Sequence, residues 1–382
     1  MRQINPDVAA VFPITPQTEL MHAFAAFVAN GQVDTELITV ESEHSAMSAT
    51  VGASAAGARS MTATSANGLA LMWEIVYIAA SSRLPIVMPV INRALSGPIN
   101  IHCDHSDMMG CRDAGWIQIY SENSQEEYDN IIQAIRIAEN HDVLLPVMIG
   151  SDGFIISHAM EVVDIYPDDA VKKFIGEYQP KHGLITDKEP FTFGPLDLQD
   201  YYMEHKRQQE EAMHNARKVI LDVGREFAGI FGTKEYGFFE TYKLEDADYA
   251  IICAGSTAGT TKAVVDKMRE NGEKVGLLKI RVFRPFPFQE IMEACRHLKG
   301  LTVLDRSASF GANGGPIFNE VRAAFNELEQ KPRIRNFVYG LGGRDINMED
   351  LEYLFGVTKK MAETGDGAGT YQFFGARGDE NG

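Results

Sequence analysis

The residues best placed to do chemistry in this chain are Thr15 and Glu43. Thr15 lies in Phe-Pro-Ile-Thr-Pro at 12–16 and Glu43 in Val-Glu-Ser-Glu-His-Ser-Ala at 40–46, so each follows an apolar run that reads as a strand and precedes a segment that reads as a helix. In a parallel α/β sheet, such turns lie at the carboxyl ends of strands, where ligands bind. A partly desolvated carboxylate there can trade a proton with a bound heterocycle, which makes Glu43 the first candidate for catalysis.

Both positions also have a purely structural interpretation. Thr15 can be the N-cap of a helix whose first residue is Pro16, although an N-cap also sits where a ligand carboxylate or phosphate binds. Glu41 and Glu43 can simply complement the positive end of a helix. Because these two carboxylates are two residues apart at a strand end, we expect only one of them to face a cleft.

Arg93 is the third candidate, because it follows a strongly apolar run in Val-Ile-Asn-Arg-Ala at 90–94. A guanidinium at a strand end can hold a carboxylate through two parallel hydrogen bonds, and a cleft beside it would suit an oxoacid substrate. The structural alternative is an ion pair with a neighbouring carboxylate.

The sequence predicts no metal site on this chain. His102, Asp104, His105 and Asp107 resemble a ligand cluster, but they equally form a helix-capping group in a polar loop, and no third well-spaced group of ligands accompanies them. The cysteines are scattered, without a Cys-x-x-Cys pair, which argues against an iron–sulfur cluster or a zinc ribbon here and fits a reducing cytosol. They are Cys103, Cys111, Cys253 and Cys295.

Composition narrows the classes of partner and compartment. The 382 residues include 53 acidic and 35 basic side chains, a net charge of −18, so nucleic acids and anionic membranes are not expected to bind. The apolar runs are shorter than the roughly 20 residues of a membrane helix. The amino terminus also lacks the basic-then-apolar pattern of a signal peptide. We therefore expect a cytoplasmic protein.

These side chains must be positioned by two α/β units. Alternating strands and helices predict a doubly wound parallel sheet in residues 1–164, and a second, smaller α/β domain in residues 241–360. Between them, residues 165–240 read as a linker arm followed by a charged connecting helix without a continuous apolar face. The glycine-rich tail, residues 361–382, reads as extended or mobile.

A set of motifs taken together resembles the α subunits of pyruvate:ferredoxin oxidoreductases, within the 2-oxoacid:ferredoxin oxidoreductase family. The resemblance covers roughly residues 6–358. The motifs are Phe-Pro-Ile-Thr-Pro-Gln-Thr at 12–18, Val-Glu-Ser-Glu-His-Ser-Ala at 40–46, Gly-Ala-Ser-Ala-Ala-Gly-Ala-Arg at 52–59, Asn-Arg-Ala-Leu-Ser-Gly-Pro at 92–98, Asp-His-Ser-Asp at 104–107 and Arg-Val-Phe-Arg-Pro-Phe-Pro at 281–287.

The resemblance implies a role for each candidate. The first domain is then the pyrimidine-binding domain for thiamine diphosphate, and the second resembles the transketolase carboxy-terminal domain. Glu43 matches the glutamate that bonds the aminopyrimidine ring and promotes its imino tautomer. Thr15 and Arg93 match the residues that hold the substrate carboxylate, and Thr15 is also expected to contact the cofactor. Asn67 and Gly68 fall in the cofactor loop after the third strand.

The resemblance also implies an oxidoreductase that is active only with partner subunits. The family cleaves a 2-oxoacid with thiamine diphosphate, passes electrons through iron–sulfur clusters to ferredoxin and transfers the acyl group to coenzyme A. In split members, a β subunit holds the diphosphate, Mg²⁺ and one cluster, and a ferredoxin-like δ subunit holds further clusters beside a γ subunit. We therefore expect Mg²⁺ and the [4Fe–4S] clusters on partner chains, with pyruvate as the first candidate substrate.

The chain departs from the family pattern at two places, and two alternative functions remain open. Family members usually begin some fifteen residues earlier, with a helix before the first strand, and carry Ser-Gln-Gly where this chain has Ser-Ala-Asn-Gly at 65–68. The same chemistry on a branched-chain or aryl 2-oxoacid is one alternative, because Thr15 and Arg93 would grip the carboxylate that all such acids share. A non-catalytic assembly subunit is the other, although assembly alone does not require a carboxylate at Glu43.

Overall fold

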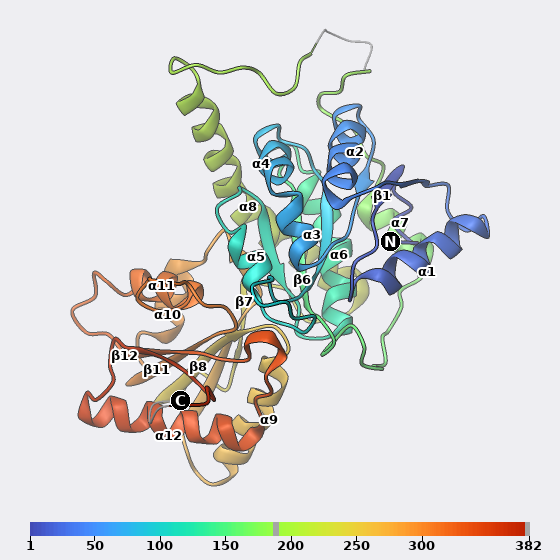
Figure 1. Cartoon of the computed structure of the whole chain (residues 1–382). Coiled ribbons are helices and arrows are strands. Elements are labelled where there is room, and N and C mark those ends of the chain that lie inside the picture. Colours follow the sequence, from blue (N-terminus) through green and yellow to red (C-terminus); the bar gives the residue numbers. More distant parts are fainter. Residues whose placement is uncertain (186–190, 379–382) are drawn as a thin grey trace.

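The computed structural model describes residues 1–185 and 191–378, and it shows two α/β units, each built on a mainly parallel sheet (Figure 1). In this part of the chain, the first sheet has the strand order β10-β5-β6-β4-β3-β1-β2, and only β10 runs antiparallel to its neighbour. Its strands are β1 (Val8–Val11), β2 (Glu36–Thr39), β3 (Ser60–Met61), β4 (Val87–Asn92), β5 (Ile117–Tyr120), β6 (Val147–Asp152) and β10 (Val282–Arg284).

Helices cover both faces of the first sheet, as a doubly wound fold requires. The helices are α1 (Thr18–Ala29), α2 (Glu43–Ala55), α3 (Ala66–Leu71), α4 (Trp73–Ser81), α5 (Ser106–Gly110), α6 (Ser124–Ala138), α7 (Asp168–Ile175) and α8 (Tyr202–Phe231). Successive side chains of β4 point to opposite faces, so that Met88 packs with α2 to α5 and Val87 packs with α6 to α8. The predicted fold class is confirmed.

The second unit has the strand order β13-β12-β11-β8-β9-β7 in the described residues, with β7 antiparallel to β9. Helices α9 and α12 cover one face of this sheet, and α10 and α11 cover the other. The elements are β7 (Phe239–Tyr242), β8 (Tyr249–Ala254), α9 (Thr257–Glu270), β9 (Val275–Ile280), α10 (Phe288–Cys295), β11 (Gly300–Asp305), α11 (Pro316–Ala324), β12 (Arg333–Val338), a 3₁₀ turn at Leu341–Gly343, α12 (Met348–Thr364) and β13 (Tyr371–Phe373).

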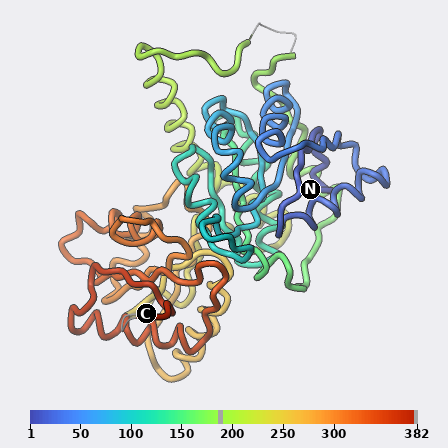
Figure 2. The backbone as a smooth tube through the Cα atoms, viewed as in Figure 1, coloured from blue at the N-terminus to red at the C-terminus, as the bar shows by residue number. Residues whose placement is uncertain are grey.

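Strand β10 ties the two units together. It directly follows β9 of the second sheet, yet it pairs with β5 of the first, with Val282 opposite Ile119. One apolar core cluster also continues from the first unit into the second. Figure 2 shows the chain passing between the two units at this point. The segment 281–287, one of the motifs that carry the resemblance, thus makes a contact within its own chain.

The structure corrects the expectation for the connecting helix and shows what part of the tail does. The second half of helix α8 belongs to the core, because Ala216, Ile220 and Phe227 are buried against the first sheet. Helix α7, from the predicted arm, packs in the same core cluster. In the tail, β13 is extended, as one of the two expectations had it, and pairs in parallel with β12, while residues 379–382 lie outside the described part. The domain boundaries at 164 and 240 remain predictions.

Candidate functional site

The candidate residues follow four neighbouring strands of the first sheet at their carboxyl ends. Glu43 follows β2, Thr15 follows β1, Gly68 follows β3 and Arg93 follows β4, and these strands lie in the order β4-β3-β1-β2. Because parallel strands end at the same edge of a sheet, residues far apart in the sequence meet there. The edge therefore holds the predicted carboxylate, hydroxyl and guanidinium together.

Glu43 is the first residue of α2 and is only 7% exposed, whereas Glu41 is exposed. The helix is capped by Ser42, whose hydroxyl accepts a hydrogen bond from the Ser45 amide at 3.2 Å. Since Ser42 caps the helix, the Glu43 carboxylate is not needed for that role. No described residue donates a hydrogen bond to it. Glu43 thus presents a buried carboxylate that a ligand can bind.

Gly68 makes room for this carboxylate. A Cβ at residue 68 would lie 2.5 Å from Thr64 Oγ1 and 2.7 Å from Glu43 Oε1, both closer than non-bonded atoms approach. Thr64, which sequence reasoning missed, is fully buried, and its hydroxyl lacks a partner in the described chain. The hydroxyl and the carboxylate therefore both lie against Gly68, and only glycine accommodates them there.

We expect Gly68→Ala to lower turnover of the assembled complex at least about tenfold, because the new methyl displaces Glu43 or Thr64. Gly68 has ordinary helical geometry, so alanine itself favours the helix by about 1 kcal/mol and the loss should not come from unfolding. Gly52→Ala in α2 is the matched control, because a Cβ there meets open space. Oxoacid-dependent dye reduction compares the two variants, and equal activities would contradict this role of Gly68.

Arg93 is 7% exposed and lacks a counter-ion. Its Nη1 donates to the main-chain carbonyl of Thr15 at 2.9 Å, and its Nε donates to that of Asn100 at 3.0 Å. In the described chain, no carboxylate lies within ion-pair distance of this guanidinium, so the structural ion pair is not formed there. A buried cation that is held only by carbonyls is costly unless an anion binds it. Arg93 and Thr15 are thus brought together around an unpaired positive charge.

Asp107 connects the segments that follow β3 and β4 at this edge of the sheet. Its carboxylate accepts hydrogen bonds from the amides of Ala66 and Arg93, at 3.1 and 3.0 Å, and from the Asn92 side chain at 2.9 Å. Burial raises the pKa of Asp107 to about 6, against the hydrogen bonds that lower it. Of the two sequence interpretations, the polar group that organises the loop describes Asp107 better than a metal ligand.

Asn67 is engaged with its own chain. Its Nδ2 donates to Ser96 Oγ at 2.5 Å, and its Oδ1 accepts from the Ser96 amide at 3.0 Å. This pair fixes α3 to the loop after β4. The amide at Asn67 therefore supports the shape of the site, and its predicted contact with a cofactor remains a prediction.

Several buried polar atoms at the same edge of the sheet lack hydrogen-bond partners in the described chain. Thr64 Oγ1, Ser65 Oγ, Asn92 Oδ1 and both amide atoms of Gln17 are buried and lack hydrogen-bond partners among the described residues. Each such group costs about 1–3 kcal/mol when it is left unpaired. A bound group that offers several donors and acceptors would relieve this cost, which fits a polar heterocycle such as an aminopyrimidine beside Glu43.

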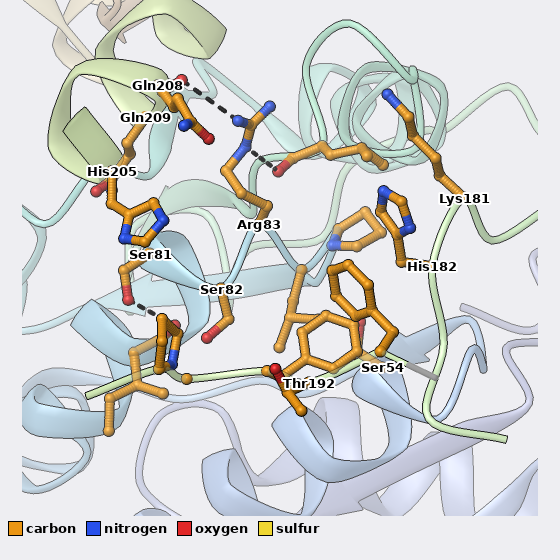
Figure 3. A pocket seen from close by; sticks show the side chains of 18 of the residues that line it. Ser54, Ser81, Ser82, Arg83, Lys181, His182, Thr192, His205, Gln208 and Gln209 are labelled. Atoms are coloured by element: carbon orange, nitrogen blue, oxygen red, sulfur yellow. Dashed lines mark hydrogen bonds between the residues drawn. The ribbon is translucent and has the colours of Figure 1, made fainter. Parts of the chain in front are cut away.

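The cavity in Figure 3 lies elsewhere. It measures about 910 Å³, and its lining includes the residues just before β4 and the segment from 191 to 209, so it is at the opposite end of that strand from Arg93. The half-buried guanidinium of Arg83 lies there, and it donates to the carbonyls of Val143, Leu144 and Gln208. Because the guanidinium is already engaged by these carbonyls, this cavity does not compete with the strand-end site.

Comparison with known sequences identifies the family of this chain. Residues 1–225 match the pyruvate flavodoxin/ferredoxin oxidoreductase thiamine diphosphate-binding family, and residues 247–351 match pyruvate:ferredoxin oxidoreductase core domain II. The pyruvate synthase subunit PorA of Thermotoga maritima is 59% identical to this chain, over 93% of this chain and 90% of that protein. The chain belongs to the pyruvate:ferredoxin oxidoreductase family. The resemblance drawn from the sequence motifs is confirmed.

Other members of the pyruvate:ferredoxin oxidoreductase family differ in the substrate they are named for. The PorA subunit of Methanocaldococcus jannaschii is 49% identical, over 94% of this chain and 91% of that protein. The ketoisovalerate oxidoreductase subunit VorA of Pyrococcus horikoshii is 44% identical, over 94% of this chain and 90% of that protein. Family membership therefore gives the type of enzyme, an oxidoreductase subunit, more firmly than it gives the oxoacid.

Solved structures support the fold of the pyruvate:ferredoxin oxidoreductase family. A 2-oxoglutarate:ferredoxin oxidoreductase from Magnetococcus marinus superposes with a TM-score of 0.67 at 19% identity, over 94% of this chain. The present chain spans 63% of that longer chain. A split-gene transketolase superposes with a TM-score of 0.51 at 12% identity. At these identities the likeness concerns the arrangement of the two α/β units.

Proposed function

We propose that this chain is the α subunit of a pyruvate:ferredoxin oxidoreductase and that it supplies the pyrimidine side of a thiamine diphosphate site. The overall reaction would be oxidative decarboxylation of pyruvate with coenzyme A to acetyl-CoA, CO₂ and reduced ferredoxin, or the reverse. The observation that carries the proposal is the unpaired Arg93 guanidinium beside Thr15, on the same sheet edge as the buried Glu43 carboxylate.

The chain's own residues would divide the work. Arg93 and the Thr15 hydroxyl would bind the carboxylate of the oxoacid, and Glu43 would hold a proton shared with the pyrimidine ring. Gly68 makes room for the Glu43 carboxylate, and Thr64 offers a hydroxyl beside it. Thiamine diphosphate, when bound, would supply the carbon nucleophile that attacks the oxoacid carbonyl. Burial of Glu43 and Arg93 would exclude water and strengthen both interactions.

The remaining components are proposed to lie on partner chains. We infer β, γ and ferredoxin-like δ subunits that carry Mg²⁺ and the [4Fe–4S] clusters, with ferredoxin as electron acceptor. The scattered spacing of the four cysteines, all buried here, supports this assignment. No helix in the described part of the chain is long and apolar enough to cross a bilayer. The cytoplasmic location remains a prediction.

A branched-chain oxoacid is the second candidate substrate, because a relative named for ketoisovalerate is 44% identical to this chain. An anaerobic pull-down from the native cell, followed by coenzyme A-dependent reduction of a low-potential dye, tests both. Activity with pyruvate would support the first candidate, and activity with only 2-oxoisovalerate or an aryl oxoacid would keep the reaction and change the substrate. Recovery of the chain without an iron–sulfur partner and without activity would contradict the proposal.

We expect Arg93→Ala to raise the KM for the oxoacid about 10- to 100-fold, because a charge-assisted contact with its carboxylate is lost. Affinity for thiamine diphosphate should stay unchanged. Arg225→Ala is the control, since that arginine is largely exposed on α8. Steady-state kinetics of the assembled complex separate the two parameters, and a change confined to cofactor affinity would place Arg93 in the cofactor site instead.

A further inference from the structure

The support of Arg93 extends into the second unit. The main-chain carbonyl of Asn100, which accepts from Arg93 Nε at 3.0 Å, belongs to the loop between β4 and α5. The side chain of the same Asn100 donates from Nδ2 to the carbonyl of Gly342 at 3.1 Å, 242 residues further along the chain. Its Oδ1 accepts from the His102 amide at 2.7 Å. One asparagine thus connects the strand-end arginine to the turn that follows β12.

The turn returns a hydrogen bond to the loop. The amide of Gly342 donates to Asp104 Oδ2 at 3.2 Å, and the other oxygen of Asp104 accepts from the Ser106 amide at 2.9 Å. Loop and turn therefore exchange hydrogen bonds in both directions. Because Asp104 is buried and Ser106 begins α5, the contact is fixed on its first-unit side.

The turn is also shaped for this contact. Gly342 has φ +60, and a Cβ there would lie 2.4 Å from Asn100 Nδ2. Gly343 has φ +81, and a Cβ there would lie 2.5 Å from His102 Cβ. Both the left-handed backbone and the close approach favour glycine at these two positions. A side chain at either position would push the loop away from the second unit.

We propose that Asn100 is a positioning residue for the oxoacid and that the second unit, through the turn Leu341–Gly343, holds Arg93 in its binding position. This inference rests on the proposed role of Arg93. The guanidinium has main-chain carbonyls as its partners in the described chain, so its position depends on where the loop carries them. A displacement of about 1 Å at a substrate-binding group is enough to weaken binding substantially. The second unit thereby becomes part of substrate recognition without touching the substrate.

Two variants test the contact from opposite sides in the assembled complex. Asn100→Ala removes the side-chain amide but keeps the carbonyl that Arg93 uses, and Gly342→Ala inserts a methyl against Asn100. Each should raise the KM for pyruvate about tenfold and leave kcat within about twofold. Gly272→Ala is the matched control, because Gly272 has φ +83 in the same unit and a Cβ there meets open space. The control should leave KM unchanged.

Double variants separate this inference from the proposed function. Adding Gly342→Ala to Asn100→Ala should raise KM no further, because the methyl then has no amide to displace. Adding Asn100→Ala to Arg93→Ala should also have no further effect on KM.

If Arg93→Ala raises KM but Asn100→Ala and Gly342→Ala both match the control, the positioning role is wrong while the proposed function stands. If Arg93→Ala itself leaves KM unchanged, the proposed function of Arg93 fails. Subunit ratios by size-exclusion chromatography check assembly, and Asn100→Ala carries the test if Gly342→Ala does not assemble.

Discussion

Glu43→Gln is expected to lower the turnover of the assembled complex by about 10²- to 10⁴-fold while leaving the subunits assembled. Glutamine keeps the size of the side chain and fills the same space beside Gly68 and Thr64, so packing should not change. It cannot accept or return a proton, which is the role proposed for the carboxylate. The KM for the oxoacid should change little, because Glu43 is not proposed to bind it.

Glu41→Gln is the control for this variant. Glu41 lies two residues earlier in the same turn but is exposed, so its loss should leave turnover unchanged. Single-turnover dye reduction with pyruvate measures the chemical step directly. Near-normal turnover of Glu43→Gln would contradict the catalytic role of Glu43 and would favour the alternative that this chain is a non-catalytic assembly subunit.

The sequence carried enough information for the sheet and for the edge that bears the site. Apolar runs of strand length alternate with helical segments, so a parallel sheet with ligands at the carboxyl ends of its strands follows from local patterns. Glu43 and Arg93 each follow such a run directly, which is why both were found. The burial of Arg93 could also be expected, because β4 lies inside the sheet, whereas β2, which precedes Glu43, is an edge strand.

The supporting contacts could not be predicted in the same way. Thr64 and Gly68 matter because of how closely they approach Glu43, and that distance depends on the packing of α3. The pairing of β10 with the first sheet could not be predicted from a strand of only three residues, because nothing in its local sequence indicates its partner. The turn at Leu341–Gly343 reads only as glycine-rich until its contact with Asn100 is known. These features depend on contacts between residues far apart in the sequence.

Asp152 is the clearest of these long-range features, and it joins the two units. It ends β6 in the first sheet, and its Oδ2 accepts from Arg306 Nη1 at 2.8 Å and from Ser256 Oγ at 2.6 Å, 154 and 104 residues away. Its Oδ1 bonds His105 Nε2 at 2.7 Å. Burial alone would raise the pKa of Asp152, but the neighbouring charges of His105 and Arg306 outweigh burial and hold that pKa well below its usual range.

Asp152→Ala is therefore expected to lower the free energy of unfolding by about 3–5 kcal/mol, because it leaves the Arg306 guanidinium buried without its carboxylate. The loss should exceed that of Ser256→Ala, which removes one hydroxyl hydrogen bond and should cost about 1 kcal/mol. Urea unfolding of the full chain, followed by circular dichroism, compares the variants. A loss for Asp152→Ala no larger than that for Ser256→Ala would contradict the role of Asp152 as the joint between the units.

Removing both charges should recover much of the lost stability. Adding Arg306→Met to Asp152→Ala takes away the uncompensated cation and keeps most of the side-chain volume, so the double variant should unfold at a higher urea concentration than Asp152→Ala alone.

The pH dependence of the free energy of unfolding gives a second test. Because the pKa of Asp152 is lower in the folded chain than in the unfolded chain, its contribution is present above about pH 4 and is lost as the pH falls further. Asp152→Ala should flatten the stability curve in that acid range, and an unchanged slope would show that the carboxylate does not stabilise the joint.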